Sequence, residues 1–185
     1  MEISVFLNNI KQDFIESCNL YHPKQIGNTI TIYKEGVDLP ELDEFQLAIL
    51  GVEEDRNSFD NTGSKDAPNA IRRALYQLFN HWNNVNIIDL GNIKTGFEIE
   101  DTYFALSNVF TTLMKYRIIP IILGGSQDLT YPIYQVYENT GKLVSGGPMM
   151  GKTIINLNAF TAKGFSSLLQ ITTAEAKRLQ PSRSV

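Results

Sequence analysis

One stretch of the chain, residues 118–132, limits the fold more than any other. Six apolar residues (118–123) predict a buried strand, a double glycine follows at once, and a polar group then opens a predicted helix over residues 128–137. An apolar strand that turns through glycine into a helix is typical of α/β proteins, in which ligands bind beyond the carboxyl ends of parallel strands. The stretch therefore predicts an α/β fold with Gln127 and Asp128 at the mouth of the sheet.

The preceding part of the chain repeats this alternation of strands and helices. Residues 45–52 and 84–90 are apolar runs of strand length, and residues 100–117 form the clearest predicted helix, with acids in its first turn and bases in its last. Asp66 is the expected N-cap of another helix. The predicted apolar face of that helix consists of Ile71, Leu75, Leu78 and Phe79. This alternation indicates βαβ units, so we expect a three-layer α/β sandwich with a mainly parallel sheet.

Length and composition indicate one globular domain. The chain has 185 residues, of which 43% are hydrophobic and 19% charged, and this excludes a disordered protein. We expect a single domain over residues 1–185 with its core at 45–140. The tail over residues 138–185 departs from the pattern, with a strand expected at 152–157 and a short helix at 173–179.

Charge and residue usage exclude several classes of protein. The net charge is -4 without a basic stripe, which predicts no nucleic-acid binding. No apolar run approaches the length of a membrane span and no basic leader opens the chain, so we expect a cytoplasmic protein that makes no membrane contact. The single cysteine, Cys18, forms no disulfide within the chain and is expected to be buried. His22 and His81 have no acidic or cysteine partners at the spacing of metal ligands.

Three segments carry a resemblance to a known family. The first is Leu-Gly-Val-Glu-Glu-Asp at residues 50–55, followed by Asn-Thr-Gly at 61–63 and Ala-Pro-Asn-Ala-Ile-Arg at 67–72. The second is Asp-Leu-Gly-Asn-Ile at 89–93, and the third is the stretch at 120–132. Their order and spacing over residues 45–140 resemble the ureohydrolases, the family of arginase, agmatinase and formimidoylglutamase.

The resemblance implies an arginase-like fold and hydrolysis of a linear C–N bond in a guanidino or formimino compound. In that family two manganese ions hold a bridging hydroxide, and one of their ligands is the His of a Gly-Gly-Asp-His-Ser signature. This chain has Ser126 and Gln127 in place of the Asp and His. A neutral amide adds no negative charge to balance a dication, so Gln127 is a poor substitute for a manganese ligand.

The other ligand segments of the family do not match either. An Asp-Ala-His-x-Asp run aligns best with Asn158, Phe160 and Ala162, and a late Ser-x-Asp-x-Asp segment has no counterpart. We therefore predict an incomplete arginase-like domain that is inactive and holds no manganese, and we assign no catalytic, cofactor-binding or metal-ligating residue. A divergent metal-free branch and a truncated chain both explain this pattern. A truncated sheet is expected to self-associate as a homo-oligomer.

Two further functions compete with a degenerate enzyme. One is a non-catalytic ligand-binding or assembly module that takes a small guanidino or formimino ligand. The other is a nucleotide binder, because the segment from Gly146 to Thr153 matches the P-loop pattern, although no solid strand precedes it. The acids at residues 53–55 are expected to form a solvated loop, and Ser126 or Asp128 is expected to cap the helix that follows.

Overall fold

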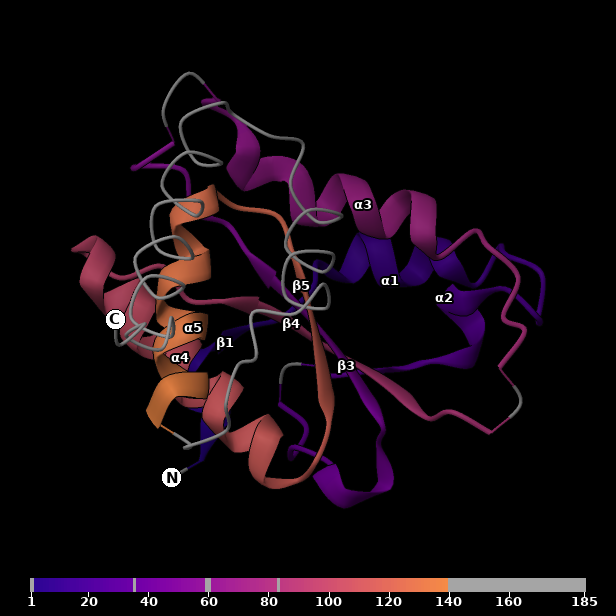
Figure 1. Ribbon diagram of the computed structural model, residues 1–185. Coiled ribbons are helices and arrows are strands. Elements are labelled where there is room, and N and C mark those ends of the chain that lie inside the picture. Colours follow the sequence, from indigo (N-terminus) through magenta and orange to yellow (C-terminus); the bar gives the residue numbers. More distant parts are fainter. Residues whose placement is uncertain (1, 35, 59–60, 83, 140–185) are drawn as a thin grey trace, which may run out of the picture.

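The computed structural model describes residues 2–34, 36–58, 61–82 and 84–139 (Figure 1). Five strands of this part form one sheet: β1 (Leu7–Asn8), β2 (Thr31–Ile32), β3 (Leu47–Val52), β4 (Ile87–Ile93) and β5 (Ile119–Leu123). The order is β1-β4-β3-β5, and β2 also pairs with β4. All pairings are parallel except that of β1 with β4. The predicted mainly parallel sheet is confirmed.

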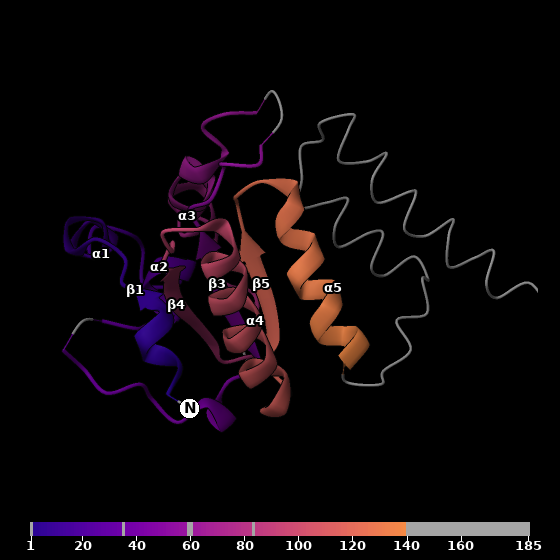
Figure 2. The ribbon, with the colours of Figure 1, turned by 90° about the vertical axis from the view of Figure 1, so that its left-hand side faces the viewer.

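Helices cover both faces of this sheet, as Figure 2 shows. One face carries α1 (Gln12–Cys18), α2 (Ile26–Thr29) and α3 (Ala67–Leu75). The other carries α4 (Ile99–Lys115) and α5 (Thr130–Asn139). Short 3-10 turns lie at Ile3–Phe6, Leu42–Glu44, Ser64–Asp66 and Gln127–Leu129. The described part therefore has the three layers predicted from the alternation of strands and helices.

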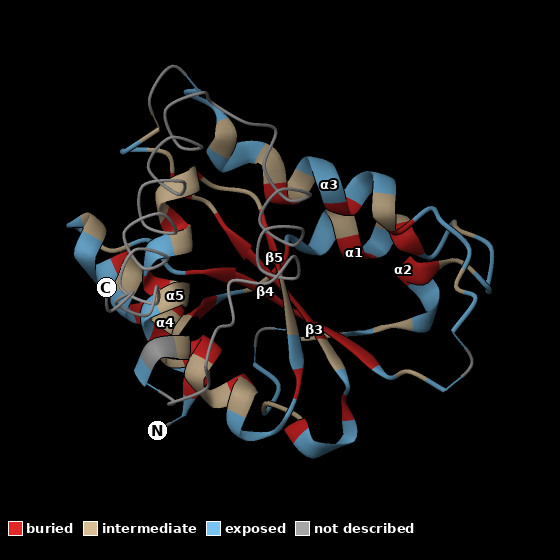
Figure 3. Cartoon of the chain, viewed as in Figure 1, coloured by how far each residue is buried: buried red, intermediate tan, exposed pale blue. Residues whose placement is uncertain are grey.

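The core follows from the alternating direction of side chains along a strand. On β3, Ala48, Leu50 and Val52 belong to the cluster that packs under α4, whereas Ile49 belongs to the cluster on the α3 side. The buried residues accordingly concentrate on the strands and on the helix sides that face them (Figure 3). Strands buried on both faces explain the nearly continuous apolar runs in the sequence.

Helix α4 forms where its local signals predict. Glu98 and Asp101 make a capping box, in which the Glu98 N–H donates to Asp101 Oδ2 at 3.0 Å. The helix ends before Arg117, whose φ is 60°. Its buried face includes Leu106, Val109, Phe110 and Leu113.

Helix α3 differs from its prediction. Asp66 makes no side-chain capping hydrogen bond, and the helix ends at Leu75 because the chain turns away there. Three of the four residues predicted on its apolar face, Ile71, Leu78 and Phe79, are 37%, 57% and 50% exposed. The face that meets the sheet instead buries Pro68 and Arg72, so a charged residue occupies the centre of this contact.

The prediction of a cap for the next helix is also corrected. Ser126 precedes a 3-10 turn and Asp128 lies within it, and neither side chain makes a capping hydrogen bond to α5. The predicted strand at 152–157, the helix at 173–179 and the whole segment from Gly146 to Thr153 lie outside the described residues.

Candidate functional site

The double glycine after β5 lets the chain turn sharply into the polar segment. Gly124 and Gly125 have φ values of 72° and 80°, in the region that favours glycine. A Cβ at Gly124 would lie 2.3 Å from Pro68 Cδ, and one at Gly125 would lie 3.0 Å from Val52 O. The turn therefore passes between the start of α3 and the end of β3, and only residues without a side chain fit.

Beyond this turn, several buried polar atoms have no partner among the described residues. Ser126 is 4% exposed, and its backbone N–H donates to Glu54 O at 2.8 Å, which joins the ends of β5 and β3. Within the described residues, its hydroxyl has no hydrogen-bond partner, nor has either amide atom of Gln127 or Oδ1 of Asp128. Buried polar atoms are rarely left unpaired in folded proteins, so such a group points to a missing ligand.

The other carboxylate oxygen of Asp128 is held in place. It accepts a short hydrogen bond from the Tyr103 hydroxyl, which itself accepts one from Asn57 Nδ2 at 3.2 Å. Burial, and then the bond to Asp128, raise the pKa of Tyr103 well above its usual range, so the phenol stays protonated as a donor. We call Asn57, Tyr103, Ser126, Gln127 and Asp128 the β5-edge site.

An ion pair between a buried glutamate and an exposed arginine lies next to this site. Glu54 is 2% exposed, accepts from Arg56 Nε at 2.9 Å and also accepts from the Thr102 hydroxyl at 3.2 Å. Hydrogen bonds from Arg56 lower the pKa of Glu54 despite its burial. Arg56 also donates to the Phe97 carbonyl at 2.6 Å, so the pair ties the end of β3 to the start of α4. The expected solvated loop at residues 53–55 is therefore wrong for Glu54.

A second ion pair joins two of the segments that carry the resemblance. Arg72 of α3 is 0% exposed and donates to Asp89 of β4 from Nε at 2.8 Å and from Nη2 at 2.9 Å. It also donates to Asn92 Oδ1 at 2.6 Å, while Tyr76 donates its hydroxyl to Asp89 at 2.7 Å. Burial alone would lower the pKa of Arg72, but the charge and hydrogen bonds of Asp89 raise it. All three nitrogens of the guanidinium thus donate hydrogen bonds, and these hold α3 on the sheet.

The donor set at the β5 edge does not fit a manganese pair. Gln127 offers one neutral amide oxygen where an imidazole would be needed, and Ser126 offers a hydroxyl in place of a carboxylate. Within the part of the chain that the structure describes, no three His, Cys, Asp or Glu side chains lie close enough to hold a metal ion. Asn158, Phe160 and Ala162 lie outside that part. The residues present at the β5 edge suit N–H donors better than a dication.

The remaining candidate residues of the sequence lie apart from this site. Cys18 is buried, as predicted, and burial raises the pKa of its thiol. His22 packs against Phe79 with ring centres 5.4 Å apart and accepts from the Lys24 backbone N–H. His81 is exposed. None of the helices in residues 2–34, 36–58, 61–82 and 84–139 has the length and apolarity needed to cross a membrane.

Sequence reasoning missed Arg72, Arg56 and Tyr103. One signal was present for the first of these, because Asp89 interrupts an otherwise apolar strand. A charge in a buried strand needs a partner of opposite charge, and Arg72 lies on the preceding helix. The roles of Arg56 and Tyr103 have no comparable signal, because both depend on where β3 and β5 end relative to α4.

The comparisons with known proteins agree with this geometry. A family model described as the arginase family matches residues 45–150. Formimidoylglutamase of Streptococcus gordonii is 23% identical over 163 residues, which cover 80% of this chain and 48% of that protein. An uncharacterized 32.2 kDa protein of Methanothermus fervidus is 33% identical over 99 residues, 50% of this chain and 35% of that protein.

A solved structure shares the fold. Trypanosoma cruzi formiminoglutamase with Mn2+ superposes with a TM-score of 0.50 and 20% sequence identity. The superposition covers 62% of this chain and 40% of the other. The chain spans less than half the length of the curated relatives described above.

Proposed function

The chain belongs to the arginase family, and we propose that it binds a small guanidino or formimino compound at the β5-edge site without hydrolysing it. One observation carries the proposal: Gln127 and Asp128 present buried polar atoms that no group in residues 2–34, 36–58, 61–82 and 84–139 satisfies. Leaving such an atom unpaired costs about 1–3 kcal/mol. A ligand that satisfies several of these atoms at once recovers that free energy on binding.

A planar cation with several N–H groups suits the atoms that are available. Asp128 Oδ1 and the amide oxygen of Gln127 are free acceptors on adjacent residues. Guanidinium and formimino groups present their N–H donors in one plane, which matches a carboxylate with a neighbouring amide. The carboxylate of Asp128 supplies the negative charge, since Arg56 neutralises the nearby Glu54. Tyr103 fixes the orientation of Asp128, so little side-chain freedom is lost on binding.

The same residues argue against hydrolysis. The reaction of a manganese pair needs a metal-held hydroxide close to the substrate carbon, and the donor set after the double glycine does not fit the metal. The Gln127 amide does not titrate, so it offers no general base to replace the hydroxide. Binding without turnover is therefore the function that this arrangement supports best.

Calorimetric titration of the purified chain with methylguanidine and with formamidine tests the binding. We expect saturable binding of one or both, and a loss of at least about tenfold in affinity in Asp128→Asn, because the charge-assisted hydrogen bonds are lost. Asp43→Asn is the matched control, since this exposed acid precedes β3 and so lies at the amino ends of the parallel strands, away from the β5-edge site. Equal affinity in the wild type and Asp128→Asn would contradict the proposed site.

Elemental analysis after Mn2+ loading, together with an amidine-hydrolysis assay, tests the absence of turnover. We expect no stoichiometric manganese and no release of ammonia or urea. Two tightly held ions per chain, with hydrolysis that depends on them, would overturn this part of the proposal.

A further inference from the structure

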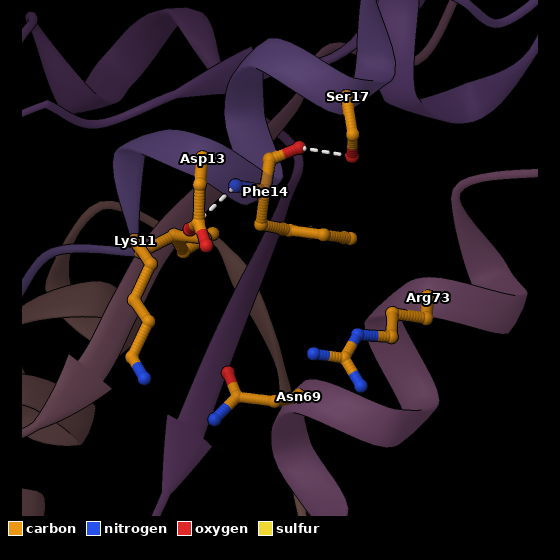
Figure 4. A pocket seen from close by; sticks show the side chains of 7 residues that line it. Lys11, Asp13, Phe14, Ser17, Asn69 and Arg73 are labelled. Carbon is orange, nitrogen blue, oxygen red and sulfur yellow. Dashed lines mark hydrogen bonds between the residues drawn. The ribbon is translucent and has the colours of Figure 1, made fainter.

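A second candidate site lies between α1 and α3, on the face of the sheet opposite α4. A pocket of about 300 Å³ opens there, with Ile10 and Phe14 among its apolar lining residues. This volume is at the lower end of the range found for sites that bind small molecules. Lys11, Asn69 and Arg73 also line the pocket, and Figure 4 shows their side chains directed to the space between the two helices.

The two cations of this pocket have no partners in the part of the chain that the structure describes. Lys11 immediately precedes α1 and Arg73 belongs to α3, so separate parts of the chain bring them together. Neither side chain makes an ion pair or hydrogen bond with any residue in the described ranges. By contrast, Arg56 and Arg72 are both paired with carboxylates. Two cations that face one pocket, without partners among the described residues, form an arrangement suited to an anion.

We propose that this pocket binds a small monocarboxylate with a short apolar chain. One carboxylate accepts hydrogen bonds from both Lys11 and Arg73, and the guanidinium binds such a group in a bidentate manner. The carbon chain then packs against Ile10 and Phe14, of which Ile10 is 5% exposed. This site takes an anion, whereas the β5-edge site takes a cation, so the two proposals are independent.

Nearby acids limit the charge of the ligand. Asp13 lines the same pocket and accepts from the Phe14 backbone N–H at 2.8 Å. Glu53 lies close to the pocket, because its Oε1 accepts a hydrogen bond from Nδ2 of the lining residue Asn69 at 2.6 Å. These two carboxylates offset much of the positive charge of Lys11 and Arg73. A polyanion such as phosphate is therefore disfavoured relative to a singly charged carboxylate.

Titration of the full chain with butyrate at low salt tests the proposal, with inorganic phosphate as the competing probe. We expect saturable butyrate binding that weakens by about tenfold in the double variant Lys11→Gln/Arg73→Gln. Asp13→Asn removes a repulsive charge and keeps the oxygen that accepts from Phe14, so its affinity should rise by about threefold. Lys115→Gln is the matched control, because this exposed lysine lies on α4 in the other helix layer.

Thermal unfolding of each variant separates a loss of binding from a loss of folding. A folded double variant with unchanged butyrate affinity would overturn the proposal. So would the absence of saturable butyrate binding to the wild type, or tighter binding of phosphate than of butyrate. Asp13→Asn alone is expected to raise the butyrate affinity. A purely structural role for these residues does not predict such an increase.

Discussion

Replacement of Arg72 tests the buried pair that joins α3 to the sheet. Arg72→Met keeps most of the volume of the side chain but removes the positive charge and four hydrogen-bond contacts, to Asp89, Asn92 and Gly91. Asp89 would keep only the donors from Tyr76 and from the Gly91 backbone, and its charge would be buried without a counter-charge. Removal of one partner from such a buried pair costs about 3–5 kcal/mol.

That cost is a large fraction of the roughly 5–15 kcal/mol that stabilises a typical domain. Urea unfolding followed by circular dichroism measures it, with the midpoint expected to fall while the slope stays constant. Arg73→Met is a matched control, because the neighbouring arginine is exposed and unpaired, and its effect should stay within about 0.5 kcal/mol. If the two variants lose equal stability, the reasoning about the buried charge is refuted.

The double variant Arg72→Met/Asp89→Leu isolates the cause. Because it removes both charges, it should recover a substantial part of the stability lost in Arg72→Met. A double variant that is less stable than the single one would show that packing at Asp89, and not the unpaired charge, dominates the effect.

Three further predictions concern the turn, the pH dependence and the tail. Gly124→Ala should destabilise the chain by about 2 kcal/mol or more in urea unfolding, since it adds a steric clash with Pro68 to the backbone strain. Gly36 has a similar φ and open space around it, so Gly36→Ala should lower the stability clearly less. Equal losses of stability in the two variants would refute the clash. Folding lowers the pKa of Glu54. Its contribution to stability is therefore present above its unfolded pKa and is lost as the pH falls through its folded pKa. Glu54→Gln should flatten the acid side of the curve of stability against pH, and an unchanged curve would contradict this prediction. Lys152→Ala should leave ATP affinity unchanged in a Mg2+ titration, and micromolar binding abolished by that substitution would support the P-loop interpretation.

The sequence by itself determined the elements whose signals are local. The apolar runs at β3, β4 and β5 predict strands, and β3 and β4 are buried along nearly their whole length because helices cover both of their faces. Helix α4 carries its capping box and its buried stripe within 17 residues, so its position follows from neighbouring positions alone. The double glycine before Ser126 likewise predicts a turn that no other residue type accommodates without strain.

Only the tertiary structure decided which polar groups are buried together. Arg72 meets Asp89 across 17 residues of chain, and Tyr103 meets Asp128 across 25. Neither separation corresponds to a periodicity of helix or strand. The same reason explains the error for α3, where Ile71 is exposed within the helix and Leu78 and Phe79 are exposed beyond its end at Leu75. The hydrophobic periodicity of a sequence reflects the neighbours of a residue within its own helix or strand. Burial of a charge depends instead on the residue that another element places opposite it, and the pairing of the strands determines which residue that is.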